Sequence, residues 1–295
     1  MRVRVCCPAK VNLHLEILGR RPDGYHELRT LLVAVGLWDS LEVRVAPPGV
    51  LDLSIDPPGA LPAGSENLVV RAAKLLQQRF GVSQGAAMRL RKVIPVGGGL
   101  GGGSSDAAGA LAALSRLWGL GCGRRELAEL ASGLGSDVPF FLFGGACWAV
   151  GRGTDLVPTV DPPGWWLVLD PGAERVATAA VYGRLAAPPL GTVSSGRPVS
   201  RWIPENGWEW CDVFRNDLYE AAVAVSPSVA RRLEILRALA PLHALLSGSG
   251  GTVYGVFPDE GAARRAMASL RGDGLIVAPV LGRAASQPWP VLLED

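Results

Sequence analysis

The chain of 295 residues has little of the material from which disulfide scaffolds and metal centres are built. Its five cysteines are scattered without a CxxC pair, and its three histidines, His14, His26 and His243, do not cluster. This spacing argues against a disulfide framework, a zinc site and a histidine-based metal centre. It favours the reducing cytoplasm as the location of the protein.

Long apolar runs and blocks of basic residues are also missing. No apolar stretch of about 18 residues is free of charged and turn residues, so we expect no transmembrane helix. The opening MRVRVCCPAK lacks the apolar core of a signal peptide. A formal net charge of +2, without a dense Lys/Arg run, argues against a general binder of nucleic acids or membrane surfaces. The oligomeric state cannot be read from the sequence.

Lysine is used sparingly. Of the 29 basic residues, only Lys10, Lys74 and Lys92 are lysines. In a chain that otherwise uses arginine, each lysine is a candidate for a specific role. For Lys74, which falls on an expected helix, compositional bias is the simpler explanation.

Hydrophobic residues make up 48% and charged residues 19% of the chain, which is enough apolar material for a full core. Residues 11–17 alternate between apolar and polar side chains, which predicts a strand with one buried face. Further elements of the first half are strands at 31–38, 41–47, 50–55 and 87–94 and helices at 66–80, 104–118 and 125–134.

Pro and Gly concentrate at residues 159–164, which predicts a boundary between one domain at 1–160 and a second at 161–295. Residues 186–207 are typical of a long Pro-rich loop. The other expected elements of the second domain are strands at 165–170, 243–246, 252–257 and 275–280 and helices at 218–225, 228–239 and 260–270. Strands and helices without a regular βα alternation predict the α+β class.

The strongest local signal is a glycine-rich loop. Six of the seven residues at 97–103 are glycine, and an Ala-rich helix is expected directly afterwards. Ordering so many glycines is costly, which makes sense where the backbone must approach a ligand closely. The unpaired N–H groups and the dipole of a helix start form an anion site, and Ser104 and Ser105 can cap the helix or donate to phosphate oxygens.

Three other interpretations of this loop compete with a phosphate-binding loop followed by a helix. A flexible linker need not run straight into an Ala-rich helix. Gly97, Gly99 and Gly102 match GxGxxG, but the acidic residue expected about 20 residues later in a dinucleotide site is not convincing. A P-loop would need a lysine, whereas Ser104 follows the last glycine. The loop is therefore predicted to bind phosphate through its backbone, with a cation supplied from elsewhere.

Lys10 and Asp137 are the charged candidates for that chemistry. Lys10 shares one face of the first strand with Asn12, and this face is either exposed to solvent or the wall of a polar site. Asp137 precedes Val-Pro, which is typical of a helix N-cap, and it could also accept the proton of a hydroxyl group. Catalysis of phosphoryl transfer depends mainly on positioning and charge stabilisation. A base, a cation and a phosphate-binding loop therefore supply nearly all the groups that the reaction needs.

A second glycine cluster, LSGSGGT at residues 246–252, is either a tight hairpin or, paired with the first loop, a segment that closes over substrate or phosphates. With it, three segments resemble the motifs of the GHMP small-molecule kinases, in the family order. They are PAKVNLHLEI at residues 8–17, PVGGGLGGGSSDAAGAL at 95–111 and LLSGSGGTVYGVF at 245–257.

The resemblance implies a two-domain GHMP kinase fold. Its N-terminal domain would be ribosomal-protein-S5-like and its C-terminal domain ferredoxin-like, with the active site in the cleft between them. It also implies ATP as phosphate donor, together with Mg²⁺, whose protein ligands remain unknown. The ATP-holding residues would be Pro95, Val96, Gly97, Gly98, Gly99, Leu100, Gly101, Gly102, Gly103, Ser104 and Ser105.

Four further segments, at 19–28, 133–145, 170–182 and 215–218, resemble the branch of this family whose substrate is a polyol linked to cytidine diphosphate. That resemblance implies transfer of the ATP γ-phosphate to the 2-hydroxyl of a methylerythritol moiety in non-mevalonate isoprenoid precursor synthesis. Lys10 and Asp137 would be the catalytic pair, with Asp137 as the base. The substrate would contact Asn12, Tyr25, His26, Thr178, Tyr182, Ser247 and Gly248.

In this reading Tyr25 and Tyr182 stack on the cytosine and His26 forms a hydrogen bond to it. Base stacking on an aromatic ring contributes roughly 1–3 kcal/mol per base. Without the resemblance, Tyr25 would be an ordinary turn tyrosine and Tyr182 an apolar anchor of a helix. The alternatives are another GHMP kinase, acting on homoserine, mevalonate or galactose, a catalytically silent nucleotide-binding protein, and a nicotinamide dehydrogenase.

Overall fold

The computed structural model of the chain describes residues 1–185, 214–270, 274–287 and 291–293. The Pro-rich loop expected at residues 186–207 lies outside these residues. None of the described helices is long and apolar enough to cross a membrane. The four described cysteines are free, in line with the scattered spacing in the sequence.

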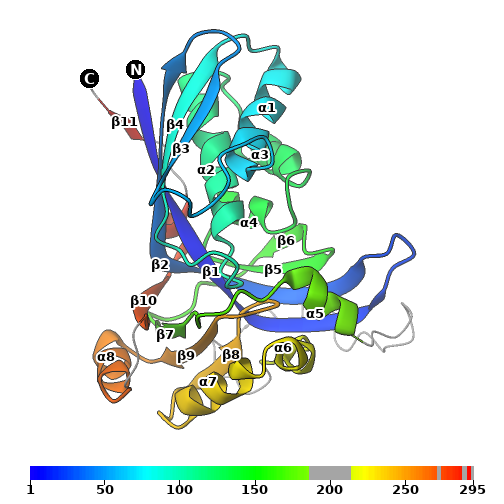
Figure 1. Cartoon of the computed structure of the whole chain (residues 1–295), viewed down its shortest axis with the longest axis vertical. Helices are drawn as coiled ribbons and strands as arrows, with labels where there is room; N and C mark the ends of the chain where they lie inside the picture. The colour runs from blue at the N-terminus through cyan, green and yellow to red at the C-terminus, as the bar shows by residue number, and fades with distance from the viewer. Residues whose placement is uncertain (186–213, 271–273, 288–290, 294–295) are drawn as a thin grey trace.

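A long antiparallel pair of strands organises the molecule. β1 (Arg2–Arg20) and β2 (His26–Ala46) pair along most of their lengths and are joined by the turn at residues 21–25. Register shifts near Pro8, Asn12 and Ile17 interrupt the ladder, and such irregularities bend a strand pair. The two strands therefore continue past the upper layer and project as an arm on the right of Figure 1.

The other strands join this pair. The path of hydrogen-bonded neighbours runs β11-β1-β2-β10-β7-β9-β8, with β3 and β4, and β5 and β6, attached beside β2. Their bounds are β3 Leu51–Asp56, β4 Gly85–Arg91, β5 Ala146–Gly151, β6 Asp155–Pro158, β7 Trp166–Asp170, β8 His243–Leu246, β9 Val253–Phe257, β10 Ile276–Leu281 and β11 Val291–Leu293. The last strand, β11, returns to the first and pairs with it.

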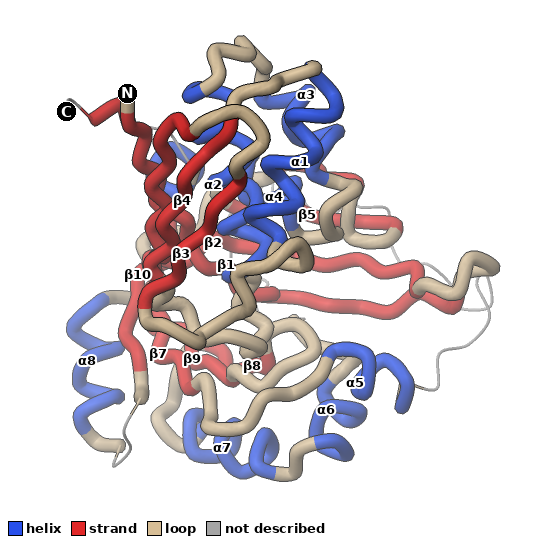
Figure 2. Tube along the Cα trace, turned by 45° about the horizontal axis from the view of Figure 1, so that its top comes forward, coloured by secondary structure: helices blue, strands red, loops and turns tan. Residues whose placement is uncertain are grey.

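Four helices cover one face of the upper sheet (Figures 1 and 2). They are α1 Leu68–Phe80, α2 Gly102–Leu117, α3 Arg124–Ala131 and α4 Val138–Phe143. The central helix, α2, is rich in alanine and lies close to β1, where a Cβ at Gly109 would come within 2.5 Å of Cys7 Sγ. This tight packing places the start of α2 beside the middle of β1.

The lower half is a smaller layer of strands and helices. β7, β9 and β8 form its sheet, and one face packs against β1, β2 and β5 through a shared apolar cluster. The opposite face is covered by helices (Figure 2). The helices of this half are α5 Thr178–Arg184, α6 Tyr219–Val225, α7 Ser228–Arg237 and α8 Glu260–Ala268, and a short α9 Arg283–Ser286 follows.

The sequence predicted most of these elements, with differences that have physical causes. The strands expected at 31–38 and 41–47 are one strand, β2, because residues 39 and 40 continue the ladder with β1. The helix expected from residue 104 begins at Gly102, so Ser104 and Ser105 lie inside its first turn and do not cap it. The predicted domain boundary at 159–164 falls in the connection between β6 and β7, and the division at residue 160 stays a prediction.

Candidate active site

A cleft of about 990 Å³ lies where β1, β2, the glycine-rich loop, α4 and α5 meet. All but two of the site residues predicted from the sequence line it. They are Lys10, Asn12, Tyr25, His26, the loop residues from Pro95 to Ser104, Asp137, Thr178, Tyr182 and Gly248. Ser105 and Ser247 are buried beside this lining and do not belong to it.

Lys10 lies at the centre of the cleft and is held from both sides. Its Nζ atom donates to Asn12 Oδ1 at 2.7 Å and lies 3.3 Å from Asp137 Oδ2. The Lys10 side chain is only 4% exposed. A buried amino group needs such partners to satisfy its donors. The geometry therefore places the Lys10 Nζ atom directly beside the Asp137 carboxylate.

Asn12 is oriented by a short chain of hydrogen bonds. Its Nδ2 atom donates to Thr30 Oγ1 at 2.8 Å, and Thr30 Oγ1 donates to the carbonyl oxygen of His14 at 2.6 Å. This leaves Asn12 Oδ1 as the acceptor for Lys10. The position of the lysine is thus fixed by the pairing of β1 with β2.

The polar face of β1 is not a solvent face. The expectation of one buried face is wrong for this strand, since every residue from Cys7 to Ile17 is buried. Lys10, Asn12, His14 and Glu16 are between 1% and 8% exposed. Loops from distant parts of the chain cover this second face, so its polar side chains must find partners inside the protein.

Asp137 stands at the start of α4 without capping it. The residue occupies the N-cap position, but its backbone is helical and its side chain makes no capping hydrogen bond. Its side chain is 35% exposed and faces Lys10. The helix-cap interpretation is therefore wrong for the side chain, and the carboxylate is available to a group that enters the cleft.

The glycine-rich loop takes conformations that only glycine adopts readily. Gly97, Gly99 and Gly101 have φ values of +77°, +77° and +72°. A Cβ at Gly99 would come within 2.2 Å of the Ser247 carbonyl oxygen, and one at Gly101 within 2.9 Å of Lys10 Cγ. The loop is thus packed directly on the catalytic candidates, and it leads into the N–H groups at the start of α2.

The second glycine cluster is a hairpin that also packs on the first loop. β8 and β9 are antiparallel neighbours, and residues 247–252 connect them. Thr252 N donates to the carbonyl oxygen of Gly98 at 3.1 Å, and Ser247 Oγ donates to that of Gly99 at 2.9 Å. The hairpin interpretation of the cluster is therefore confirmed, and the hairpin packs on the first loop. Its closing over substrate or phosphates stays a prediction.

Aromatic side chains gather at the far end of the cleft, near the arm formed by β1 and β2. The rings of His26 and Tyr182 lie 5.2 Å apart at an angle of 38°. Tyr25 is 53% exposed, and the guanidinium carbon of Arg152 lies 3.6 Å from its ring centre. Tyr182 is therefore a neighbour of His26. The Tyr25 ring is instead covered by Arg152, a contact that the sequence did not predict.

Two of these groups have altered acidity. Burial raises the pKa of the Tyr182 hydroxyl to about 12, and the nearby Asp137 charge adds to the effect. Burial, reinforced by the Arg20 charge, lowers the pKa of His26 below its usual value. Both rings are thus neutral near pH 7, which suits recognition by stacking and hydrogen bonding. Nearby, the hydroxyl groups of Thr178 and Ser249 lie 2.8 Å apart.

Lys92 is a site residue that sequence reasoning left unassigned. Its buried Nζ atom lies between Asp39 and Asp106, 2.7 Å from the latter, and the side chain lines the cleft behind the glycine loop. Asp39 also accepts from the backbone of Val93 and Ile94. This cluster ties the start of α2 to the end of β4. The signal was the rarity of lysine together with its position three residues before Pro95.

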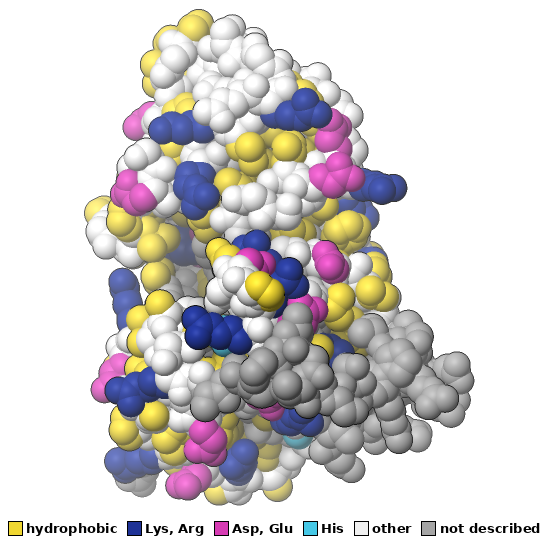
Figure 3. Space-filling view, turned by 90° about the vertical axis from the view of Figure 1, so that its right-hand side faces the viewer, with side chains coloured by type: hydrophobic (Ala, Val, Ile, Leu, Met, Phe, Trp, Pro, Cys, Tyr) yellow, Lys and Arg dark blue, Asp and Glu magenta, His cyan; other side chains and the backbone are white. Residues whose placement is uncertain are grey.

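The surface around the arm carries charges of both signs. Figure 3 shows this face, with Lys and Arg side chains interspersed among Asp and Glu over apolar and uncharged groups.

Comparisons with known proteins identify the family of the chain. The family models for the GHMP kinases N terminal domain and the GHMP kinases C terminal domain match residues 67–145 and 198–274. A 4-diphosphocytidyl-2-C-methyl-D-erythritol kinase of Nitrosospira multiformis is 42% identical over 264 residues, 89% of this chain and 85% of that protein. One of Geobacillus thermodenitrificans is 36% identical over 288 residues, 97% of this chain and 99% of that protein.

Solved structures give the same picture. A crystal structure of 4-(cytidine 5'-diphospho)-2C-methyl-D-erythritol kinase, 36% identical, superposes with a TM-score of 0.76 and covers 95% of this chain and 99% of its own. The homoserine kinase of Cytophaga hutchinsonii is 17% identical with a TM-score of 0.73, over 99% of this chain and 97% of its own, which reflects a shared fold. The α+β, two-domain kinase fold expected from the motifs is thereby confirmed.

Proposed function

The chain belongs to the 4-diphosphocytidyl-2-C-methyl-D-erythritol kinases of the GHMP kinase family, and from this premise we propose that it phosphorylates the 2-hydroxyl group of 4-diphosphocytidyl-2-C-methyl-D-erythritol. It is an ATP-dependent kinase, so the products would be the 2-phosphate of that compound and ADP. The reaction would serve the non-mevalonate route to isoprenoid precursors.

The observation that carries the proposal is the Lys10–Asp137 pair, 3.3 Å apart in the same cleft as the glycine-rich loop. Asp137 would accept the proton of the attacking hydroxyl group. Lys10 would orient the carboxylate and offset the negative charge that develops on the transferred phosphoryl group. Asn12 would position both the lysine and the substrate.

The loop and the helix start would hold the phosphates of ATP. The backbone at 97–103 lies open to the cleft, and no side chain other than that of Leu100 projects from it. N–H groups at the start of α2 point toward an anion without the need for a lysine within the loop. Most of the catalytic effect in such a site comes from positioning and electrostatic stabilisation.

Recognition of the cytidine is assigned to the other end of the cleft. Tyr25, His26 and Tyr182 supply ring faces and a hydrogen-bonding imidazole, and Thr178 lies between them and the catalytic pair. Arg152 and Arg20 line the same end and would attract the diphosphate group that links the base to the polyol.

Mg²⁺ is part of the proposal because it neutralises the ATP phosphates during transfer. Among the described residues, no group of three or more His, Cys, Asp or Glu side chains could hold a metal ion. This fits an ion held mainly by phosphates, as Mg²⁺ commonly is. Ser105 is a candidate ligand: its Oγ is buried in the first turn of α2, beside the cleft lining, and has no hydrogen-bond partner among the described residues.

The experiment that tests this function measures ADP release with ATP and Mg²⁺ in the presence of four candidate acceptors. These are 4-diphosphocytidyl-2-C-methyl-D-erythritol, mevalonate, homoserine and galactose. We expect turnover with the cytidine compound only, and mass spectrometry should find one added phosphate. Turnover with another of these alcohols would contradict the substrate assignment while leaving a kinase active site.

A further inference from the structure

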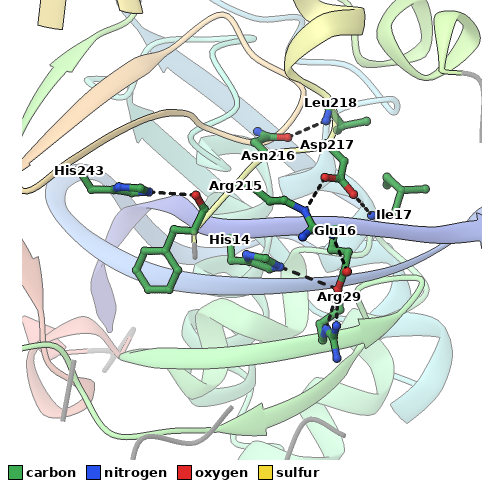
Figure 4. A network of polar contacts seen from close by, with 10 residues as sticks. His14, Glu16, Ile17, Arg29, Arg215, Asn216, Asp217, Leu218 and His243 are labelled. Carbon is green, nitrogen blue, oxygen red and sulfur yellow. Dashed lines mark hydrogen bonds and ion pairs between the residues drawn. The ribbon is translucent and has the colours of Figure 1, made fainter. Parts of the chain in front are cut away.

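A short segment that precedes α6 is bound to the outer edge of β1. Asn216 forms a parallel bridge with Leu15. Leu15 N donates to the carbonyl oxygen of Arg215 at 2.7 Å, and Asp217 N donates to that of Leu15 at 2.9 Å. Residues 215–217 therefore extend the sheet by one short piece of chain. Figure 4 shows Arg215, Asn216 and Asp217 beside β1.

Charged groups fix the register of this piece along β1. Arg215 Nη2 lies 2.6 Å from Glu16 Oε1, and the buried Glu16 also pairs with Arg29 of β2. Asp217 Oδ2 accepts from Ile17 N at 2.9 Å (Figure 4). These contacts favour the observed register, because a shift of one residue would separate Arg215 from Glu16 and Asp217 from the backbone N–H of Ile17.

The fixed register places the Asn216 amide under the β8–β9 hairpin. The side chain is 7% exposed, and its Nδ2 atom donates to the carbonyl oxygens of Leu246 at 2.8 Å and Gly248 at 2.7 Å. Its Oδ1 atom accepts from Leu218 N at 2.9 Å. Both amide hydrogens and the amide oxygen are thus engaged, and both donors serve the hairpin loop.

That loop lies against both the Lys10–Asn12 pair and the ATP loop. A Cβ at Gly248 would lie 3.2 Å from Asn12 Oδ1 and 3.4 Å from Lys10 Nζ. One residue earlier, Ser247 Oγ donates to the carbonyl oxygen of Gly99. A displacement of this loop would therefore move the lysine and the phosphate cradle relative to one another.

We infer that Asn216 is a positioning residue for phosphoryl transfer: it holds the hairpin loop against the Lys10–Asn12 pair and Gly99, and so fixes the distance between the catalytic lysine and the ATP loop. The inference rests on the proposed function. Asn216 does not line the cleft and acts only through Leu246 and Gly248.

Two adjacent isosteric changes test it. Asn216→Asp replaces the double donor with a carboxylate that faces two carbonyl oxygens, whereas Asp217→Asn keeps an acceptor for Ile17 N and has no contact with the hairpin. For Asn216→Asp we expect kcat to fall about 10- to 100-fold, the scale of a small misplacement of reacting groups. The KM for the cytidine substrate should change less than about threefold, because the aromatic end is untouched. Asp217→Asn should stay within about twofold in both constants.

The pH profile gives a readout that a loss of stability would not. A carboxyl group between two carbonyl oxygens has a raised pKa, and its protonated form can donate to one of them. The ratio of the kcat of Asn216→Asp to that of the wild type should therefore rise as the pH is lowered from 8 to 6, whereas Asn216→Ala should show a constant ratio.

The outcomes separate the two proposals. No turnover of the cytidine compound by the wild type would refute the proposed function. An active wild type with a normal kcat for Asn216→Asp would refute only the positioning role. An equal loss in Asp217→Asn would also overturn that role. Failure of both Asn216→Asp and Asn216→Ala to fold, judged by circular dichroism, would assign Asn216 to stability alone and overturn it as well.

Discussion

The two ends of the cleft are built in different ways. At the phosphate end, Lys10 is almost fully buried, and Gly99 and Gly101 leave no space for a side chain. At the base end, Tyr25 is about half exposed and lies beside a turn. The chemical step needs groups fixed within fractions of an ångström, so its end is locked by packing. Recognition of a base tolerates adjustment, and its end is carried on the projecting arm.

This contrast predicts where a substitution alters kcat and where it alters KM. Changes at the phosphate end should lower turnover or ATP affinity, whereas changes at the base end should weaken binding of the acceptor. The lower half of the molecule contributes to both ends of the cleft. The strands β8 and β9 support the glycine loop, and α5 carries Thr178 and Tyr182 (Figure 1).

The largest effect is expected from Asp137→Asn. Loss of the proton acceptor should reduce kcat by roughly two to four orders of magnitude, the usual contribution of a general base. Because the proposed ATP contacts are made by the backbone of the glycine loop and not by the Asp137 side chain, ATP affinity should change little. Steady-state kinetics would measure kcat, and a nucleotide-binding titration would measure ATP affinity. Near-normal turnover would contradict the role of Asp137 as base.

Gly101→Val should give the next largest effect. The residue has a φ of +72°, and a Cβ would come within 2.8 Å of Phe141 and 2.9 Å of Lys10. We expect ATP affinity to fall at least about tenfold because the loop must shift. Gly123→Ala is the matched control, since φ is −74° there and no atom lies within 4 Å of its Cβ. Unchanged nucleotide affinity of Gly101→Val, measured by calorimetry, would contradict the cradle.

Tyr25→Ala tests the base end. Loss of one stacking partner should raise the KM for the cytidine substrate roughly 5- to 100-fold, which corresponds to 1–3 kcal/mol, with kcat within about threefold. Tyr25→Phe keeps the ring and should behave like the wild type. A fall in kcat with an unchanged KM would mean that the two ends are not separable in the way that their packing indicates.

The smallest effect is expected on stability, and it comes from His14, a buried residue of β1. Burial lowers the pKa of His14 to about 4, reinforced by Arg215 and Arg29 and opposed by Glu16. The unfolded chain then binds the proton first, so stability is complete above pH 6.5 and falls as the pH drops toward 4. The slope attributable to His14 should be about 1 kcal/mol per pH unit in that window.

Urea unfolding between pH 7 and pH 4.5 would measure this slope, with His14→Gln as the variant that removes it. A glutamine cannot take up the proton, so its free energy of unfolding should depend less on pH than that of the wild type. Identical pH dependence of the two proteins would show that His14 is not buried as a neutral group.

Some parts of the site could be predicted from the sequence because they depend on patterns of neighbouring residues. The glycine run, the Ala-rich helix after it and the alternation along β1 each depend on neighbours within about ten residues. The sequence also singled out Asp137, but its interpretation as a helix cap was wrong for the side chain, which makes no capping hydrogen bond. Arg152 was missed, since nothing near it in the chain distinguishes it from an ordinary surface residue. Asn216 lies in the segment at 215–218 whose resemblance to the family was noted, but no role could be assigned to its side chain from the sequence.

The sequence by itself determined which segments form strands and helices, where the backbone can approach a phosphate, and which family supplies the chemistry. Only the tertiary structure decided that the polar face of β1 is buried, that Arg152 covers the Tyr25 ring, and that Asn216 holds the hairpin under Lys10. These facts depend on contacts between residues more than 100 positions apart. Local propensity and periodicity carry no information about such contacts, because the pairing of β1 with distant segments alone brings them together.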